Sequence, residues 1–344
     1  MAKITYPYET PPEFGEAIEV ADGVLWLRQP LPMALDHVNI FAFDEGDGWA
    51  IVDTGFDTKE SRDMWQEMFK GPLGGKPVTR VLGTHHHPDH IGLAGWFQSD
   101  FGAELITTRT AWLFARMLTL DVHDTLAPEA EQHYRRAGMS DEILQTRKAE
   151  RPFNFADCVA PMPLGFTRIK DGDVVTFGGR SWDVRCGNGH APEHATLWSR
   201  DDNLVIGGDQ LLPHISANIG VYATEPEADP LSEWLESCER LAQYATEDQL
   251  VLPGHKLPFT GLPHRLKLMA ENHEHALERL LEHVTEPKVG GECFSPLFKR
   301  KIGPAEYGLA LVEALAHLNC LYQKGLVTRT LNAKGAYEWC KVRT

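Results

Sequence analysis

The sequence predicts an α/β fold in which two β-sheets are flanked by helices. Three observations lead to this prediction: the chain has 344 residues, short apolar runs recur along most of it, and helical stretches separate them. We expect helices near residues 58–70, 91–100 and 230–245. The expected strands are GVLWLR, VNIFAF, WAIVD, TRVLGT, AELIT, DVVTF, SWDVRC, ATLWS, NLVIG and LVLP.

The stretch LGTHHHPDHIG contains the densest group of metal-binding side chains in the sequence. It is internal, it is interrupted by proline and aspartate, and it follows an apolar strand, which argues against an expression tag. In an extended segment alternate residues point the same way, so His85 and His87 are expected to reach one ion while His86 faces elsewhere. The proline then ends the strand and turns Asp89 and His90 toward a second point. The spacing indicates two metals.

Three further segments supply residues of metal-ligand type, which are needed because a catalytic zinc takes about three protein ligands plus a water. The segments VRCGNGHAPEH, NLVIGGDQLL and DQLVLPGHKLPF offer His190, Asp209 and His255. Each residue follows an apolar run and a glycine, as expected where a strand enters a tight turn. Asp53 in GWAIVDTG follows a strand in the same way. A turn or capping role is the alternative for each alone, but the repetition favours a shared metal centre.

Together these motifs resemble the metallo-β-lactamase superfamily, and their order from Val24 to His255 is similar to its glyoxalase II and thioesterase-like branch. The segments GDQLLPHISANI and VLPGHKLPFTGLPHR, with the helices that follow, resemble a subfamily with a winged-helix tail that is related to the LACTB2-like branch. The resemblance implies an αββα sandwich with the metals at one edge. It implies one metal held by His85, His87 and His190, a second held by Asp89, His90 and His255, and Asp209 as the bridge. It also implies that Asp53 orients a ligand from behind, since a ligating imidazole needs an acceptor for its other N–H.

Imidazole and carboxylate ligands suit zinc, with iron or manganese as alternatives, so the expected cofactors are two divalent ions, Zn²⁺ first. Two ions about 3.5–4 Å apart lower the pKa of a shared water and polarise a substrate oxygen. The expected nucleophile is therefore a metal-bridging hydroxide that attacks an ester, thioester or amide carbonyl. Asp89 is expected to orient it or pass on its proton, and Asp209 to serve catalysis by bridging the metals. No GxSxG motif occurs, which argues against a serine hydrolase.

Other polar residues close to the expected ligands are candidates for supporting a ligand or contacting substrate. His194 follows His190 by four positions. The segment PHISANIGVY after the bridging aspartate adds His214, Ser216, Asn218 and Tyr222. An ordinary capping or hydrogen-bonded loop role is the alternative for each of them.

The pattern divides the chain into a catalytic domain, residues 1–262, and a separate module, residues 263–344. Within the first, residues 110–164 have helical periodicity and are predicted to be an insertion that covers the active-site mouth and shapes the pocket. The alternative is a set of helices that bury only their own apolar faces.

In the C-terminal module two long helices precede a hairpin around NAKG, an order that resembles a winged helix. Winged helices often read DNA, but the second helix carries only Lys324 at its end and no arginine. A structural or homodimer-forming role is therefore expected of the module, rather than nucleic-acid binding.

The composition agrees with a cytoplasmic enzyme. Residues 264–344 carry 12 Lys+Arg against 9 Asp+Glu, and the rest of the chain carries 21 against 40, so the net charge of −16 belongs to the catalytic part. Such acidity disfavours a long phosphate backbone as partner. The six cysteines form no CxxC pair and read as reduced thiols. Neither an export signal nor a membrane span is expected.

We therefore predict a dinuclear metal-dependent hydrolase that acts on a thioester or a related small-molecule acyl substrate. The first alternative is a metal-dependent ribonuclease guided by the winged-helix tail. A non-catalytic metal-binding protein is a second, which the complete ligand set disfavours. An iron enzyme of oxygen or sulfur chemistry would be expected to alter the first motif.

Overall fold

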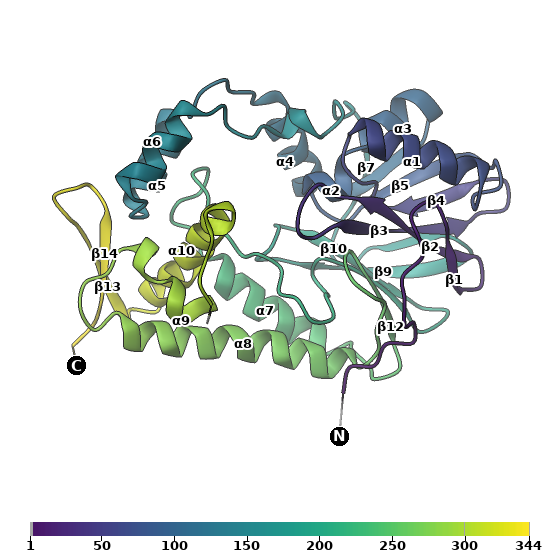
Figure 1. Ribbon diagram of the computed structural model, residues 1–344. Helices are drawn as coiled ribbons and strands as arrows, with labels where there is room; N and C mark the ends of the chain where they lie inside the picture. Colours follow the sequence, from purple (N-terminus) through teal and green to yellow (C-terminus); the bar gives the residue numbers. More distant parts are fainter. Residues whose placement is uncertain (1–2, 299, 344) are drawn as a thin grey trace. The chain divides into compact units, whose positions relative to one another are not determined.

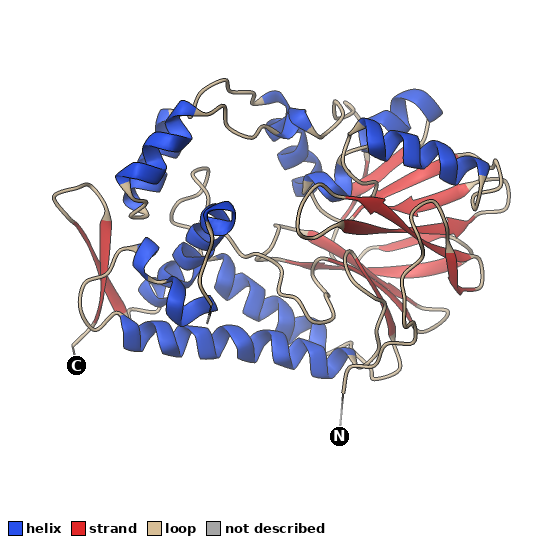
Figure 2. Cartoon of the chain, in the orientation of Figure 1, coloured by secondary structure: helices blue, strands red, loops and turns tan. Residues whose placement is uncertain are grey.

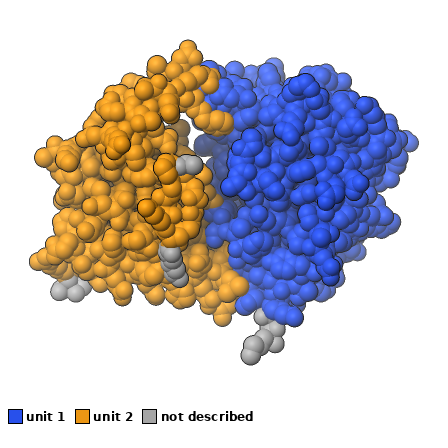
Figure 3. Space-filling view, viewed as in Figure 1, with its two compact units in different colours: residues 1–122, 154–217, 241–266 blue, residues 123–153, 218–240, 267–344 orange. Residues whose placement is uncertain are grey.

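The computed structural model describes residues 3–298 and 300–343, and these fall into two compact units. Unit 1 comprises residues 1–122, 154–217 and 241–266, and unit 2 comprises residues 123–153, 218–240 and 267–344 (Figure 3). Unit 1 contains both large β-sheets, and unit 2 is mainly helical with one small hairpin (Figure 2).

The first sheet of unit 1 has seven strands in sequence order. They are β1 (Ile18–Ala21), β2 (Val24–Pro30), β3 (His37–Asp44), β4 (Trp49–Val52), β5 (Val78–Gly83), β6 (Glu104–Thr108) and β7 (Thr167–Ile169). Neighbours from β1 to β4 are antiparallel, and neighbours from β4 to β7 are parallel. The parallel half needs long crossover connections, and helices supply them.

The second sheet has five strands in the order β12-β11-β10-β9-β8. They are β8 (Val174–Phe177), β9 (Arg180–Gly187), β10 (His194–Ser199), β11 (Leu204–Gly208) and β12 (Leu250–Pro253). Strands β8 to β11 pair antiparallel, and β12 joins β11 in parallel. Strands β9, β11 and β12 therefore run the same way, and their carboxyl ends lie at one edge of the sheet.

Helices cover the outer face of the seven-stranded sheet (Figure 1). They are α1 (Lys59–Lys70), α3 (Ala94–Phe101) and α4 (Arg109–Leu120). The α1 helix begins where the Thr58 hydroxyl accepts a hydrogen bond from the Ser61 amide, which satisfies an otherwise free N–H. Trp65 of α1 and Phe97 of α3 pack edge to face, 4.9 Å apart, over Ile40 of β3. This layer is a hydrophobic core of unit 1.

The second core lies between the two sheets. Side chains alternate along β3, so that Ile40 belongs to the helix-facing core and Phe41 and Phe43 belong to the inter-sheet core. The Phe43 ring meets Phe177 and Trp182 of the other sheet edge to face, at 5.2 and 5.5 Å. Because both faces of the first sheet are covered, its central strands carry apolar runs such as IFAF in β3 and WAIV in β4.

Unit 2 is built around a buried helix. Its helices are α5 (Pro128–Arg136), α6 (Asp141–Ala149), most of α7 (Pro230–Ala242) and of α8 (Leu262–His283), α9 (Phe294–Phe298) and α10 (Tyr307–Gln323). Eleven consecutive or near-consecutive residues of α10 are buried, which requires neighbours on all its sides. The hairpin of β13 (Val327–Leu331) and β14 (Tyr337–Lys341) follows α10.

The ten expected strands are all present, and the expected fold class is confirmed. The sequence reading missed β1 and β7, which are four and three residues long and only partly buried. Of the expected insertion, α4 belongs to unit 1 while α5 and α6 belong to unit 2. The C-terminal segment has the expected order of helices and hairpin, and its winged-helix character stays a prediction.

No helix in the described part of the chain combines the length and the apolar character needed to cross a membrane.

The inter-sheet core should be sensitive to cavities. We expect Phe43→Ala to lower the free energy of unfolding by about 3–5 kcal/mol, because it removes a fully buried ring between two aromatic neighbours. Chemical denaturation followed by circular dichroism measures this. Val174→Ala is the control, since that side chain is 46% exposed and should change stability by less than about 1 kcal/mol. Equal effects of the two variants would contradict the assigned core.

Candidate metal centre

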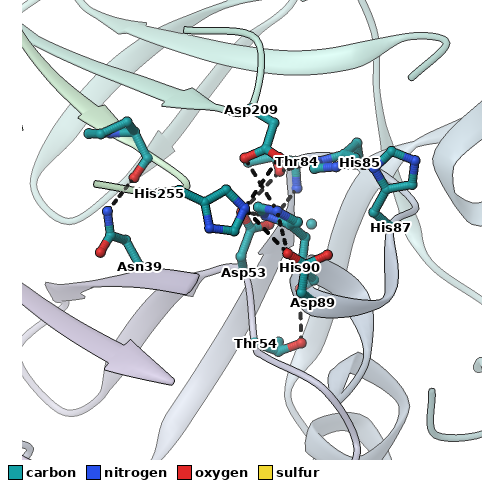
Figure 4. Close-up of polar contacts among 12 residues, drawn as sticks. Asn39, Asp53, Thr54, Thr84, His85, His87, Asp89, His90, Asp209 and His255 are labelled. Carbon is teal, nitrogen blue, oxygen red and sulfur yellow. Dashed lines mark hydrogen bonds and ion pairs between the residues drawn. The ribbon is translucent and has the colours of Figure 1, made fainter. Parts of the chain in front are cut away.

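Residues of metal-ligand type follow the carboxyl ends of five strands in unit 1. Asp53 follows β4, His85 follows β5, His190 follows β9, Asp209 follows β11 and His255 follows β12. Since β4 runs parallel to β5, and β11 runs parallel to β12, these ends share an edge of each sheet. The fold brings the side chains into one buried cluster (Figure 4).

The histidine-rich loop starts earlier than the sequence pattern suggests. Strand β5 ends at Gly83, so the expected extended strand through His85 and His87 is wrong. The two imidazoles nevertheless approach each other, with 3.0 Å between His85 Nε2 and His87 Nδ1. A loop conformation, and not strand alternation, points them at one place.

The next turn carries the second pair of expected ligands. It is the one-turn helix α2 (Pro88–Ile91), and its first position is the proline, where the missing N–H costs nothing. His90 Nε2 lies 3.4 Å from Asp89 Oδ2 and 3.4 Å from Asp209 Oδ1. Both ligand-type residues of this turn therefore face the end of β11.

The donor atoms gather in three overlapping groups. They are His85, His87 and His190; His85, His90 and Asp209; and Asp89, His90 and His255. Within each group the atoms lie within 4.8 Å of one another. Asp209 connects the outer groups, because its Oδ2 is 3.5 Å from His190 Nε2 and 3.3 Å from His255 Nε2. The arrangement offers metal-binding donors at more than one point.

Asp53 fixes the orientation of His90 from behind the cluster. Its backbone has a φ of 62°, a left-handed conformation that is uncommon outside glycine. Its carboxylate accepts hydrogen bonds from the Thr84 amide at 2.9 Å, the Thr84 hydroxyl at 3.0 Å and His90 Nδ1 at 2.8 Å. A carboxylate accepts the Nδ1–H, so Nε2 of His90 is the nitrogen left for a ligand role.

A backbone carbonyl orients His255 in the same way. His255 Nδ1 donates to the His37 carbonyl at 2.8 Å, which leaves Nε2 facing Asp89 and Asp209. The turn is held by Asn39, whose side-chain amide donates to the carbonyls of Pro253 and Lys256.

Gly254, just before His255, permits a close approach. A Cβ atom there would lie 2.4 Å from Asp209 Oδ1, so any larger residue would displace the carboxylate.

His194 supports the cluster from the second sheet. Its Nε2 accepts a hydrogen bond from the Asp209 amide at 3.1 Å, and its ring stacks on His85 at 4.5 Å. The side chain is fully buried. Gly208 precedes Asp209 with a φ of 47°, and a Cβ there would lie 2.5 Å from the His194 ring. The described contacts of His194 are thus with protein groups that position two expected ligands.

Burial keeps the first imidazoles neutral. It lowers the pKa of His85 and of His87 well below the usual range, and the neighbouring imidazoles lower both further. A neutral imidazole keeps the lone pair that a metal requires. These two side chains are therefore in the protonation state of a ligand near pH 7.

The other half of the cluster consists of charged pairs. Burial would lower the pKa of His255, but the carboxylates of Asp209 and Asp89 outweigh it and raise that pKa to about 10. The same balance raises the pKa of His90. Burial would raise the pKa of both carboxyl groups, yet the two imidazoles hold it well below the usual range. A divalent cation here would take over the neutralising role of the imidazolium groups.

The donor set fits a cation by a second criterion. His90 Nε2 and Asp209 Oδ1 are buried and have no hydrogen-bond partner among the described residues, although they lie 3.4 Å apart. Buried polar atoms are usually satisfied, and an exception needs an explanation. A metal ion bound by both atoms would supply one.

The remaining candidates lie outside these contacts. His214 and Ser216 are exposed, and His214 Nδ1 is 3.4 Å from the Tyr6 hydroxyl. Asn218 and Tyr222 belong to unit 2, where the Asn218 amide donates to the Glu313 carboxylate at 2.8 Å. Their roles toward substrate stay predictions.

His86 faces away from the cluster of donor atoms. Its ring lies 5.0 Å from Phe114 of α4 and is stacked 6.4 Å from Phe155. Burial lowers its pKa to about 3, so it is a neutral aromatic wall of the loop.

The sequence reading missed three residues that hold the cluster together. Thr84 stands beside the histidine motif and could have been found there, since it directly precedes His85. His37 and Asn39 begin β3, more than 200 residues from the turn that they hold, and no local pattern marks them.

Two family models match the chain. Residues 33–255 match the metallo-beta-lactamase superfamily, and residues 277–342 match the metallo-beta-lactamase-like C-terminal domain. The first match includes every residue of the donor groups.

Individual relatives cover nearly the whole chain. A beta-lactamase domain protein from Burkholderia ambifaria is 36% identical with a TM-score of 0.90, covering 98% of each chain. A metallo-beta-lactamase family protein from Thermus thermophilus is 26% identical with a TM-score of 0.78, covering 94% of this chain and all of the other. The probable metallo-hydrolase YqjP of Bacillus subtilis is 24% identical, over 89% of this chain and 94% of its own.

The hydrogen bond from His90 to Asp53 should matter for metal binding. We expect Asp53→Asn to weaken Zn²⁺ binding about 10- to 100-fold, because the amide accepts the His90 Nδ1–H less well and the buried charge is lost. Competition titration against a chelating dye measures the affinity. Asp63→Asn on α1 is the control, since that carboxylate is exposed and paired with Lys59. An unchanged affinity in Asp53→Asn would show that the contact does not orient the ligand.

Proposed function

This chain belongs to the metallo-beta-lactamase superfamily and is a metallo-hydrolase of that superfamily, and from this premise we propose that it hydrolyses a thioester or related acyl substrate with two bound divalent metal ions. The observation that carries the proposal is the convergence of three groups of imidazole and carboxylate donors at one edge of unit 1. Donors of these types suit zinc best, with iron and manganese next.

The two outer groups of donors define the proposed sites. The first site is assigned to His85, His87 and His190, the second to Asp89, His90 and His255, and the bridging position to Asp209. Orienting contacts of Asp53 and the His37 carbonyl fix the imidazole nitrogens in the second site. Each site then has three protein donors of its own, the number that a catalytic zinc takes besides a water, and Asp209 would be shared between the two sites.

Two bound divalent cations would lower the pKa of a water molecule and polarise a substrate carbonyl. Asp89 would receive the proton, because its carboxylate lies at the edge of the second group and is the more exposed of the two carboxylates, at 17% against 9% for Asp209. Of the first group, His85 is buried and would close the site from behind.

A nucleophilic cysteine does not compete with this mechanism among the described residues. The cysteine side chains are buried except for Cys340, which is half-buried. Cys158 is within the electrostatic reach of Asp89, and burial first, followed by nearby carboxylates, raises the pKa of its thiol to about 12. A thiol with that pKa is neutral and weakly nucleophilic near pH 7.

The acyl substrate class rests on sequence order and on charge. We propose that the order of motifs relates the chain to the glyoxalase II and LACTB2-like branch, and that its C-terminal tail has winged-helix character. The catalytic part is strongly acidic, which favours a small acyl molecule over a nucleic acid. The ribonuclease alternative is tested by the same experiment.

Metal analysis combined with a substrate panel tests the proposal. We expect about two zinc, iron or manganese ions per chain, and turnover of acyl-CoA or acylglutathione that is lost with chelator and restored by metal. The panel also holds a lactone, a β-lactam and RNA. Cleavage of RNA alone would establish the nuclease, and stoichiometric metal with no turnover of any substrate would favour a binding protein.

Removal of a donor should reduce both metal content and turnover. We expect His190→Ala and Asp209→Ala to lower metal content and to reduce kcat/KM at least about 100-fold, while circular dichroism stays native. His275→Ala is the control, because it removes an exposed imidazole of α8. Full activity in either donor variant would rule out the assignment.

Asp89 can be tested apart from metal binding. We expect Asp89→Asn to lower kcat about 100-fold or more while leaving part of the metal content, because the amide cannot take a proton. Elemental analysis and initial rates between pH 6 and 9 measure the two effects. A loss of metal with an unchanged kcat per bound metal would show that Asp89 is only a ligand.

A further inference from the structure

Unit 2 contains a cavity of about 320 Å³ that no part of the metal centre lines. Its walls come from α5, from the segment before α7, from α10 and from the β13–β14 hairpin. Such a volume lies at the lower end of the range for small-molecule sites. The residues that matter here are Arg136, Glu227, Leu315, Arg329, Tyr337 and Trp339.

In one wall of the cavity an arginine is already paired with a carboxylate. Arg329 pairs with Glu227 at 2.9 Å, and its guanidinium carbon lies 4.3 Å from the centroid of the Tyr337 ring and 5.3 Å from that of Trp339. The Arg329 side chain is only 13% exposed. The positive charge of Arg329 is therefore neutralised by Glu227, and its guanidinium packs against the two aromatic rings.

The second guanidinium is available to a ligand. Arg136 donates to the Tyr337 hydroxyl, and its guanidinium carbon lies 5.0 Å from the Tyr337 ring centroid. Within residues 3–298 and 300–343 it has no carboxylate partner, in contrast to Arg135, which pairs with Glu131 and Asp141. A guanidinium has five N–H donors in a planar fork, so most of those on Arg136 remain for another group.

The rest of the lining includes apolar side chains. Trp339 lines the cavity but is itself fully buried, so it contributes a ring to the wall and no accessible donor. Leu315, Ala137 and Pro226 supply further apolar wall beside Arg136.

We propose that this cavity binds a small organic monocarboxylate with an aromatic or other apolar body. The fork of Arg136 matches the two oxygens of a carboxylate, and the apolar walls accept the body. Glu129 and Glu227 also line the cavity, and their negative charges disfavour a dianion such as phosphate. The site is separate from the proposed hydrolase chemistry and does not depend on it.

Calorimetric titration of the full-length protein with sodium benzoate tests the proposal. We expect saturable binding to the wild type and at least about tenfold weaker binding to Arg136→Gln, which loses the charged fork. Arg135→Gln is the matched control: it makes the same charge change one residue away, outside the cavity, and should bind as the wild type does.

Thermal melts of all variants show whether each is folded. Absence of saturable heat with the wild type up to about 10 mM benzoate would overturn the proposal. Equal weakening by Arg135→Gln and Arg136→Gln would also overturn it, since net charge alone would then explain the binding. Inorganic phosphate that binds as tightly as benzoate would overturn the assignment of a carboxylate with an apolar body.

Discussion

The alignment of strand ends is the constraint on which the candidate metal centre depends. Parallel pairing of β4 with β5, and of β11 with β12, places polar residues at one edge of each sheet, and the packing of the two sheets brings together residues that are about 200 positions apart. The two cores of unit 1 hold this edge, because one fixes the first sheet to its helices and the other fixes it to the second sheet. Small shifts of either sheet would separate donors that lie 3.3–3.5 Å apart.

Hydrogen bonds to Nδ1 fix the ring orientation of two histidines in the cluster. Asp53 takes the Nδ1–H of His90, and the His37 carbonyl takes the Nδ1–H of His255. In each case the remaining nitrogen faces the carboxylates, so the tautomer and the ring orientation are set before any cation binds. The left-handed backbone at Asp53 and the glycine at 254 are local costs that this arrangement requires.

The two units differ in the surroundings that they give to charged side chains. Unit 1 buries carboxylates and imidazoles together, and their pKa values move in opposite directions as each stabilises the charged form of the other. Unit 2 buries Arg329 among aromatic rings and leaves Arg136 with spare donors beside a cavity. A buried cluster of donors favours metal chemistry, whereas an open guanidinium beside apolar walls favours recognition of an organic anion.

The sequence by itself determined the fold class and ten of the strands, because apolar periodicity is a local signal, and it predicted the donor residues that the structure brings together. It could not determine how the motif is shaped: His85 and His87 converge from a loop, since β5 ends at Gly83. Only the tertiary structure showed that His37 and Asn39 hold the His255 turn and that Arg136 lacks a carboxylate partner among the described residues. Those features depend on contacts between distant segments, which leave no periodic trace in the chain.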